Sequence, residues 1–402
     1  MTVLVGHPTG NPNAHHAALA HLEAARLEAF CVPWMPSSTT LAALEMFAPM
    51  RSMTRRLGRR AFPALADAPK IQGRLGELRR LLTRTAGRGD PALPYQANDW
   101  LMAIMARECR RPAVTAVHAY EDCSLASFVE ARRLGKACIY DMPIGYHPAW
   151  THTETGLVRR YDDWLPAAAM SPRRYMHPDQ KRQEMELADL VLAPSAFVRD
   201  TIAEFHPEKH VALASYGVDT VAWPVARRSA QADITFLFAG PCSVRKGVPL
   251  LLDAWRAAGL KHAHLQLVGS WQLAESKKRE LPPRVQWVGP VAQDELRKHY
   301  ARADVFVLPT YFEGRALVIG EALSSGLPVL STPASGVADL VDADCGHLLP
   351  IGNLDAMVES LRWFEGNRDR LPAMGRAARA QAERCTWESY RRCVTRAVAQ
   401  YV

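Results

Sequence analysis

Apolar residues in the second half of the chain form short runs that alternate with helical patterns. Residues 305–309 are a β-branched apolar run typical of a buried strand, and a polar loop follows it. A helical pattern then covers 316–325, and Gly326 ends it just before the next apolar run. The same alternation predicts strands at 234–239, 265–268, 285–288, 305–309 and 328–331, and helices at 248–258, 293–302, 316–325, 354–365 and 371–384. Such alternation is typical of a parallel sheet covered by helices.

The first half of the chain shows the same alternation less regularly. The pattern predicts strands at 2–5, 27–32, 113–118, 137–141 and 189–193, and helices at 15–27, 98–110, 155–165, 178–187 and 196–205. It weakens between residues 33 and 94, where helices at 57–61 and 71–82 are predicted within an insertion. A chain of 402 residues exceeds one typical core. We therefore predict two α/β domains, at 1–207 and 208–385, and a last helix within 386–402.

Two carboxylates follow the predicted strand at 305–309. Glu313 lies in the loop, and Glu321 lies eight residues later in the helix. Ligands bind at the carboxyl ends of parallel strands, and the first N–H groups of a helix attract anions. This arrangement suits a ligand with anionic oxygens in the middle and hydroxyl-rich rings at both ends, such as a nucleotide sugar. A solvated loop Glu and a helix-surface Glu paired with a Lys would explain the pattern equally well.

A second candidate segment, GPCSVRKG at 240–247, lies between a predicted strand and a predicted helix. Its backbone N–H groups, with Arg245 and Lys246, could meet a diphosphate, where negative charge develops as the leaving group departs. The alternative is a cationic pair on an exposed turn.

The segment EGRALVIGEALSSGLPV at 313–329 resembles the E-x7-E signature of glycosyltransferase family 4. Three other segments match in the same order, ADLVLAPSAFVRDTI at 188–202, SYGVDTVAW at 215–223 and FAGPCSVRKGVPLLLDAW at 238–255. The resemblance covers 185–365 closely and 1–184 loosely. It implies a GT-B fold of two facing Rossmann-like domains, with the last helix returning to brace the first domain. It also implies transfer of a sugar from a nucleoside diphosphate donor with retention of configuration.

The resemblance assigns roles to individual residues. Glu313 would hold the donor sugar, Glu321 the ribose hydroxyls, and Arg245 and Lys246 the diphosphate. His118, in VHAYED at the end of its predicted strand, would reach the donor sugar, although a lone His there is often structural. Further donor-binding candidates are Gly240, Ser243, Gly314, Arg315, Ala316, Leu317 and Val318. Acceptor-binding candidates are Gly10, Asn11 and Tyr146, of which Gly10 and Asn11 could form a simple turn and Tyr146 could serve domain packing.

Two positions depart from the family pattern. Pro241 stands where the family often carries an Arg, and Arg245 could supply the missing guanidinium. Arg315 and Ala316 follow Glu313-Gly314 where the family continues with Phe-Gly or similar residues. A cation at 315 could favour an acidic sugar or simply point outward.

The net charge of +8 is unevenly distributed. Between Arg51 and Arg88 there are eleven Lys and Arg residues but only two acids. We expect Arg55, Arg56, Arg59 and Arg60 to contact anionic lipid or an acidic acceptor, and a solvated helix face is the alternative. Because this run lacks the interleaved aromatic residues of single-strand binders, no nucleic-acid partner is expected.

The remaining patterns restrict compartment and cofactors. The eight cysteines form no C-x-x-C pair, the first residues lack the features of a signal peptide, and no apolar run reaches membrane-spanning length. We therefore expect a cytoplasmic protein, free or peripheral at the inner membrane face. The D-x-D at 342–344 falls in a predicted turn away from the crevice, so neither a metal nor another cofactor is expected.

The expected partners are a nucleotide sugar donor and a saccharide or lipid-linked acceptor. Two rival functions stay open on the sequence. One is a sugar-nucleotide epimerase or hydrolase that uses the same donor pocket, and the other is a donor-binding pseudoenzyme.

Overall fold

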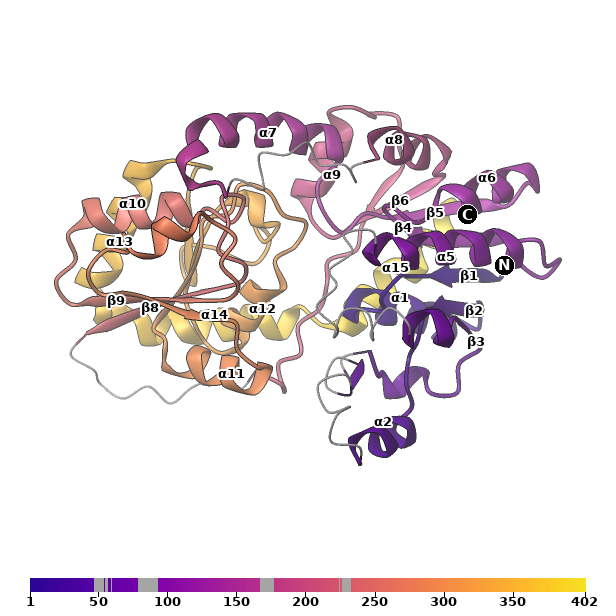
Figure 1. Cartoon of the computed structure of the whole chain (residues 1–402), viewed down its shortest axis with the longest axis horizontal. Helices are drawn as coiled ribbons and strands as arrows, with labels where there is room; N and C mark the ends of the chain where they lie inside the picture. The colour runs from indigo at the N-terminus through magenta and orange to yellow at the C-terminus, as the bar shows by residue number, and fades with distance from the viewer. Residues whose placement is uncertain are drawn as a thin grey trace.

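A computed structural model of the chain describes residues 1–46, 54, 57, 58, 60–78, 93–166, 177–223, 225 and 233–402. The described residues form two α/β domains that lie side by side (Figure 1). Each domain is built on one sheet, and every pair of neighbouring strands within these two sheets runs parallel. The prediction of parallel-sheet α/β domains is confirmed.

The first sheet has seven strands in the order β3-β2-β1-β4-β5-β6-β7. Its strands are β1 (Val3–Gly6), β2 (Leu27–Val32), β3 (Lys70–Gln72), β4 (Ala116–Tyr120), β5 (Ala137–Asp141), β6 (Leu190–Ala193) and β7 (Val211–Leu213). Its helices are α1 (Pro12–Glu23), α2 (Ser38–Glu45), α5 (Leu93–Glu108), α6 (Leu125–Arg133), α7 (His147–Arg160), α8 (Pro178–Leu187) and α9 (Ala196–Ala203), with 3-10 turns at Pro63–Leu65 and Asp162–Trp164. Since β7 pairs with β6, the first sheet continues beyond residue 207, where the sequence predicted the domain boundary.

The second sheet has six strands in the order β10-β9-β8-β11-β12-β13. Its strands are β8 (Ile234–Ala239), β9 (Ala263–Val268), β10 (Val285–Gly289), β11 (Val305–Leu308), β12 (Val329–Ser331) and β13 (Gly346–Leu348). The helices are α10 (Val248–Ala258), α11 (Gln293–Arg302), α12 (Leu317–Ser324), α13 (Leu354–Gly366), α14 (Leu371–Arg384) and α15 (Trp387–Tyr401), with 3-10 turns at Glu275–Lys278, Pro333–Ser335 and Arg368–Arg370.

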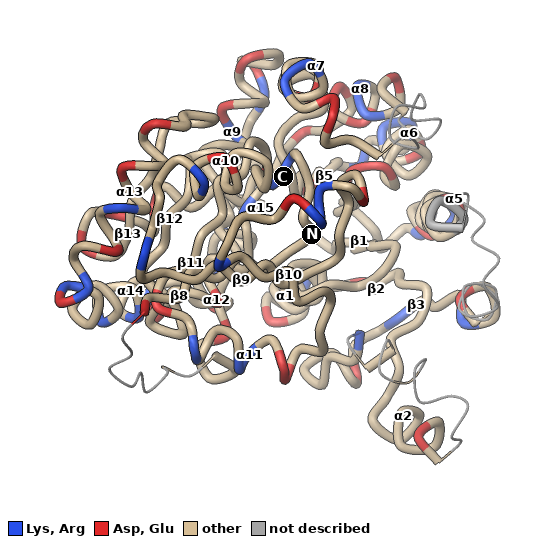
Figure 2. The backbone as a smooth tube through the Cα atoms, turned by 60° about the vertical axis from the view of Figure 1, so that its left-hand side comes forward, with Lys and Arg blue, Asp and Glu red and all other residues tan. Residues whose placement is uncertain are grey.

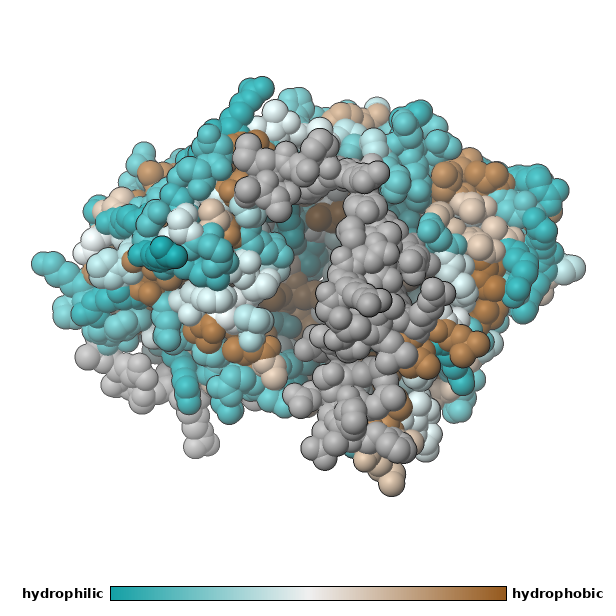
Figure 3. Space-filling view, viewed as in Figure 1, coloured by the Kyte–Doolittle hydropathy of each residue, from teal (hydrophilic) through white to brown (hydrophobic). Residues whose placement is uncertain are grey.

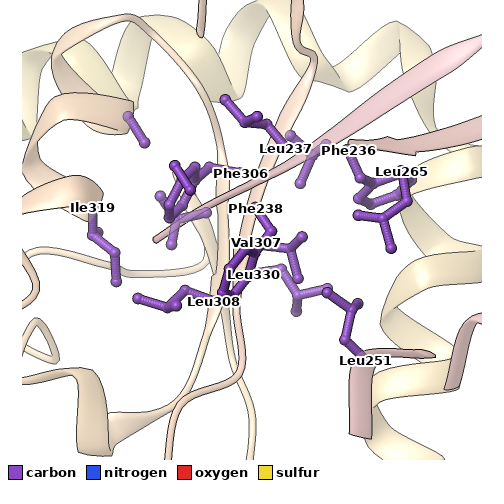
Figure 4. Close-up of a cluster of buried hydrophobic side chains, with 14 of the residues drawn as sticks. Phe236, Leu237, Phe238, Leu251, Leu265, Phe306, Val307, Leu308, Ile319 and Leu330 are labelled. Carbon is purple, nitrogen blue, oxygen red and sulfur yellow. The ribbon is translucent and has the colours of Figure 1, made fainter. Parts of the chain in front are cut away.

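The core of the second domain is apolar on both faces of its sheet. Phe236 and Phe238 of β8 and Phe306 of β11 are fully buried among leucines and valines of neighbouring strands (Figure 4). Leu251 of α10 and Ile319 of α12 close this cluster from the helices. Strands β8, β9 and β11 contain no Lys, Arg, Asp or Glu, and charged residues lie mainly on helices and loops (Figure 2). Burial on both faces explains why β8 and β11 are nearly continuous apolar runs, whereas β9 carries the exposed His264 and the half-buried Gln266.

Two chain segments cross between the domains, one before β8 and one after α14. They touch where Val218 N donates to Cys385 O at 2.8 Å. A Cβ atom on Gly217 would lie 2.2 Å from Trp387 N, so only glycine permits this approach. Helix α15 then packs against α1, and Tyr390 and Val398 join the core of the first domain.

Helix α7 and the turn after it lie between β5 and β6 in sequence but reach the second domain. Leu157, Tyr161 and Trp164 belong to the apolar cluster of that domain. The hydroxyls of Tyr161 and Tyr311 lie 2.9 Å apart, and Arg160 Nη1 donates to Gly352 O at 3.2 Å. This segment, residues 147–165, therefore bridges the two domains.

Several predicted elements of the first domain were wrong. The helix predicted at 71–82 begins at residue 74, because Lys70–Gln72 pairs with β2 as an edge strand. The strand predicted at 113–118 is shifted, and β4 runs on to Tyr120. Of the helix predicted at 57–61, Leu57 and Gly58 are helical, residue 59 lies outside the described residues, and Arg60 is in a turn. Among the described residues, no helix is both long and apolar enough to cross a membrane.

Candidate active site

Glu313 joins the two loops that the sequence singled out. Its Oε1 lies 2.5 Å from Lys246 Nζ and also contacts Arg245 Nη1. The same guanidinium donates to Phe312 O at 2.7 Å. Burial lowers the pKa of Lys246, and the Glu313 carboxylate opposes that shift. Two cations and one carboxylate thus meet at the carboxyl ends of β8 and β11.

The phosphate-loop candidate at 240–247 has the geometry that its glycines permit. Gly247 precedes α10 with φ +75°, and a Cβ atom there would lie 2.0 Å from Pro309 O. Ser243 Oγ accepts a hydrogen bond from Lys246 N at 3.3 Å. Gly240 follows β8 directly and has φ +143°, a conformation that other residues rarely adopt. Glycines therefore let the loop turn tightly and approach the end of β11.

Glu321 lies on α12, in the second turn of the helix that follows the Glu313 loop. Its Oε2 accepts a hydrogen bond from Tyr300 OH at 3.2 Å. Burial raises the pKa of Glu321 to about 7, while Tyr300 and the nearby Arg297 oppose the shift. No side-chain hydrogen bond caps α12 at Ala316, and Leu317 and Val318 form its first turn. The amides of this turn are in the place where an anion would be stabilised.

A cavity of about 510 Å³ lies beside the phosphate loop, between the domains. It is lined by Glu121, Ile144, Gly145, His147, Trp150, Glu154, Leu157, Val158, Leu165, Lys181, Ser243, Val244, Arg245, Gln272 and Phe312. On the first-domain wall Lys181 Nζ is 3.0 Å from Glu121 Oε1, and burial raises the pKa of Glu121 to about 7. The surface of the molecule is also hollowed where the domains meet (Figure 3). Sequence reasoning missed Lys181, Glu154 and Gln272, because none of them lies at a predicted strand end or in a matched motif.

His118 lies inside β4 and not at its end. The side chain is fully buried, with Nδ1 3.0 Å from His21 Nε2 and Nε2 3.5 Å from Asp141 Oδ2. The ring belongs to a polar cluster in the first domain and does not line the cavity. A direct contact of His118 with a donor sugar stays a prediction.

The candidate acceptor residues serve the fold of the first domain. Asn11 Oδ1 caps α1 by accepting from Ala14 N at 3.0 Å, and Gly10 N donates to His7 Nδ1 at 2.9 Å. Tyr146 is buried, with its hydroxyl 3.0 Å from His206 Nε2. Their acceptor roles stay predictions. His7, which sequence reasoning missed, follows β1 directly, and burial lowers its pKa to about 3.

Arg315 neither points outward nor lines the described cavity. Its guanidinium is buried and donates to Asp339 Oδ1 at 2.8 Å and Gly336 O at 3.0 Å. The suggestion that this cation faces an acidic sugar or solvent was therefore wrong. Gly314, just before it, pairs with Ile144 in an isolated antiparallel bridge between the domains.

Two other predicted features have local partners. Arg60 Nη1 lies 2.7 Å from Glu77 Oε1 with both side chains largely buried, whereas Arg55, Arg56 and Arg59 lie outside the described residues. Arg60 is thus not part of a solvated basic face. In the D-x-D, Asp342 Oδ1 accepts from Asp344 N at 3.0 Å within an exposed turn.

Part of the second domain matches a known family. Residues 233–365 match the model of the family described as glycosyl transferases group 1. The matched stretch lies within the second domain, from the start of β8 to the end of α13. Among curated proteins, the chain is 28% identical over 277 residues to sulfoquinovosyl transferase SQD2 of Arabidopsis thaliana. That alignment covers 64% of this chain and spans about half, 52%, of the relative's length.

Solved structures support the fold over the whole chain. The lipopolysaccharide outer core galactosyltransferase WaaB aligns with a TM-score of 0.63 and 15% identity, over 100% of both chains. Anabaena HepE, in complex with UDP and glucose, aligns with a TM-score of 0.60 and 14% identity, also over 100% of both chains. The chain thus has the two-domain GT-B fold, and the predicted fold class is confirmed.

Proposed function

We propose that this protein is a retaining glycosyltransferase of family 4 that moves a sugar from a nucleoside diphosphate sugar to an acceptor hydroxyl. The contact of Lys246 and Arg245 with one oxygen of Glu313 carries the proposal. A bound diphosphate would take over the two cations, and a hydroxyl of the donor sugar would take over the carboxylate. The UDP and glucose present in the HepE structure support this class of donor.

In the proposed reaction the bond between the anomeric carbon and the diphosphate oxygen breaks. Lys246, Arg245 and the first amides of α12 would stabilise the charge that develops on the leaving group. The acceptor hydroxyl would attack the same face of the sugar and pass its proton to the departing diphosphate. Glu321 would accept hydrogen bonds from the ribose hydroxyls. Because these groups stabilise the leaving diphosphate, we expect the reaction to need no metal ion.

The cavity beside α7 supports a saccharide or lipid-linked saccharide as acceptor. Its lining combines the apolar faces of Trp150 and Phe312 with the polar groups of Glu154 and Gln272. Sugar rings combine an apolar face with hydroxyl groups, so such a lining suits them. The similarity to a sulfoquinovosyl transferase and to a lipopolysaccharide outer core galactosyltransferase supports a role in glycan synthesis.

A thermal-shift panel of nucleoside diphosphates and nucleotide sugars, followed by product analysis, tests the proposal. A ligand at 100 times its Kd stabilises the native state by about 2.7 kcal/mol, which is readily measured. We expect one nucleotide to stabilise the protein, and the matching donor to yield a glycosylated acceptor in the presence of EDTA. Conversion of the donor alone to an epimer would favour an epimerase. Loss of turnover in EDTA that Mn²⁺ restores would contradict the metal-independent reaction.

A further inference from the structure

The guanidinium of Arg315 is buried where the two domains and their connecting segments meet. Its side chain is only 3% exposed. Nη1 donates to Asp339 Oδ1 at 2.8 Å, Gly336 O at 3.0 Å and Pro194 O at 3.5 Å, and Nη2 lies 3.5 Å from Cys385 Sγ. A guanidinium is permanently charged and has five N–H donors, so its burial requires such a set of acceptors.

These acceptors come from different parts of the molecule. Gly336 and Asp339 follow β12 in the second domain, whereas Pro194 follows β6 in the first. Cys385 ends α14, and its Sγ donates to Tyr216 O at 3.1 Å on the other connecting segment. One side chain therefore contacts both domains and the place where the chain crosses between them.

The residue before Arg315 is held by the first domain as well. Ser195 Oγ donates to Gly314 O at 2.6 Å, and Ile144 pairs with Gly314. A Cβ atom on Gly314 would lie 1.7 Å from Pro143 O, which shows how closely the two backbones approach. We call residues 314 and 315 with these first-domain partners the clasp.

Separation of the domains would break the clasp. Arg315 would lose the Pro194 carbonyl and Gly314 the Ser195 hydroxyl, and a buried cation that loses an acceptor is costly. Since Glu313 precedes the clasp directly, its backbone position follows that of Gly314. Glu313 is also the residue that contacts both cations of the phosphate loop.

We propose that Arg315 is a positioning residue that couples the placement of the Glu313 carboxylate to the docked arrangement of the two domains. The guanidinium itself touches no reacting group. When the first domain is docked, the clasp holds the loop after β11 so that Glu313 meets the donor. The kinetic consequence rests on the proposed function, but the coupling of the loop to the domain interface does not.

Arg315→Met tests the clasp because it keeps most of the length of the side chain and removes the charged guanidinium group. Hydrogen exchange should become faster in residues 309–316. The kcat for sugar transfer should fall roughly tenfold or more, since small displacements of positioning groups are costly, while the Kd for UDP stays within about twofold. Arg315→Lys keeps the positive charge but lacks the planar set of guanidinium donors, and should retain part of the kcat that Arg315→Met loses. The matched control Asp339→Asn keeps both first-domain contacts and should change exchange in the loop much less.

Unchanged exchange in 309–316 of a folded Arg315→Met variant would overturn the proposal, as would equal losses of kcat and UDP affinity. Should Arg315→Met fail to fold, Ser195→Ala breaks the other half of the clasp and should show the same pattern. Ser195 also caps α9, so Asn353→Ala, which removes the equivalent cap of α13, controls for that loss. If the wild type turns over no donor, the proposed function fails, and loop exchange in the variants still decides the clasp.

Discussion

The two domains share one architecture but bury charge differently. Among the described residues of the second domain, the only buried Lys, Arg, Asp or Glu side chains are Lys246 and Arg315. Lys246 contacts Glu313, and Arg315 anchors the loop that carries Glu313. The first domain buries Asp141, Glu184, His21 and His118, and none of these residues lies in the loops that carry Lys246 and Glu313.

Glu184 shows what buried charge does in the first domain. It is fully buried, and its carboxylate accepts hydrogen bonds from Tyr140 OH at 2.9 Å and from the backbone amides of Asp122, Ser124 and Leu125 at 3.0 to 3.1 Å. The carboxylate thus ties α8 to the start of α6. The two buried cations of the second domain are therefore tied to the loop that carries Glu313, whereas buried Glu184 of the first domain ties two helices together.

The largest expected effect tests the second domain. Lys246→Ala should lower kcat by a factor on the order of 10² or more, because in the proposed reaction this cation would stabilise the leaving group. Donor binding should weaken less than turnover. Steady-state kinetics and calorimetry with UDP measure both quantities, and Lys298→Ala, an exposed lysine on α11, is the matched control. Unchanged turnover in the Lys246 variant would show that the loop does not meet the leaving group.

Glu321→Ala should weaken the binding of the nucleoside diphosphate itself. Loss of a carboxylate that holds ribose hydroxyls costs about 1.5–3 kcal/mol per charge-assisted hydrogen bond. Calorimetry on the variant and on Glu295→Ala, which removes a partly exposed α11 carboxylate, separates this effect from a general change in charge. Equal affinity of wild type and Glu321→Ala would refute the ribose assignment.

His118→Phe tests whether buried polar groups of the first domain are structural. The ring is replaced by one of similar shape, and His21 Nε2 and the Asp141 carboxylate lose a partner. The free energy of unfolding should fall by about 1–3 kcal/mol, while folded protein binds UDP as before. Denaturant titration measures this loss, and His152→Phe, at an exposed position of α7, should stay within about 0.5 kcal/mol. A stable variant with strongly reduced turnover would instead favour the direct role that the family resemblance implies.

The smallest expected effect is a pH dependence from Glu321. Its native pKa, raised to about 7 by burial, exceeds the ordinary carboxyl value of 4.5. Between these values the native state binds the proton that the unfolded state has released, so this contribution to stability is lost as pH rises toward 7. In this range the free energy of unfolding should fall with rising pH by the slope that corresponds to at most one proton. Glu321→Gln should remove that slope. Identical slopes in wild type and variant would contradict the shifted pKa.

The sequence predicted the second domain more closely than the first for a physical reason. Strand β8 and helices α10, α11 and α14 lie at the predicted residues, because strands buried on both faces give unbroken apolar runs between helical ones. Strand β3 was missed, since a three-residue edge strand contributes too little apolar pattern to compete with the helical pattern at 71–82. The local hydrophobic pattern therefore predicts an element reliably only where most of its side chains are buried.

The candidate site was predictable where its residues come from loops at strand ends. Arg245, Lys246 and Glu313 were singled out in this way, and the structure brings them together. The surroundings of Arg315 and His118 were not predictable, because their partners lie far along the chain. His21 is 97 residues from His118, and Cys385 is 70 residues from Arg315. Side-chain direction at such places depends on tertiary packing, which no local motif encodes.

The bridging segment at 147–165 limits how this molecule can be recombined. Tyr161 and Trp164 are encoded with the first domain but complete the apolar interior of the second. A chimera that joins a foreign first half at the β7 connection would bring its own residues to these positions and leave Tyr311 without the Tyr161 hydroxyl. A foreign first half would therefore have to bring a compatible bridging segment with it. The two halves of the gene are expected to diversify together.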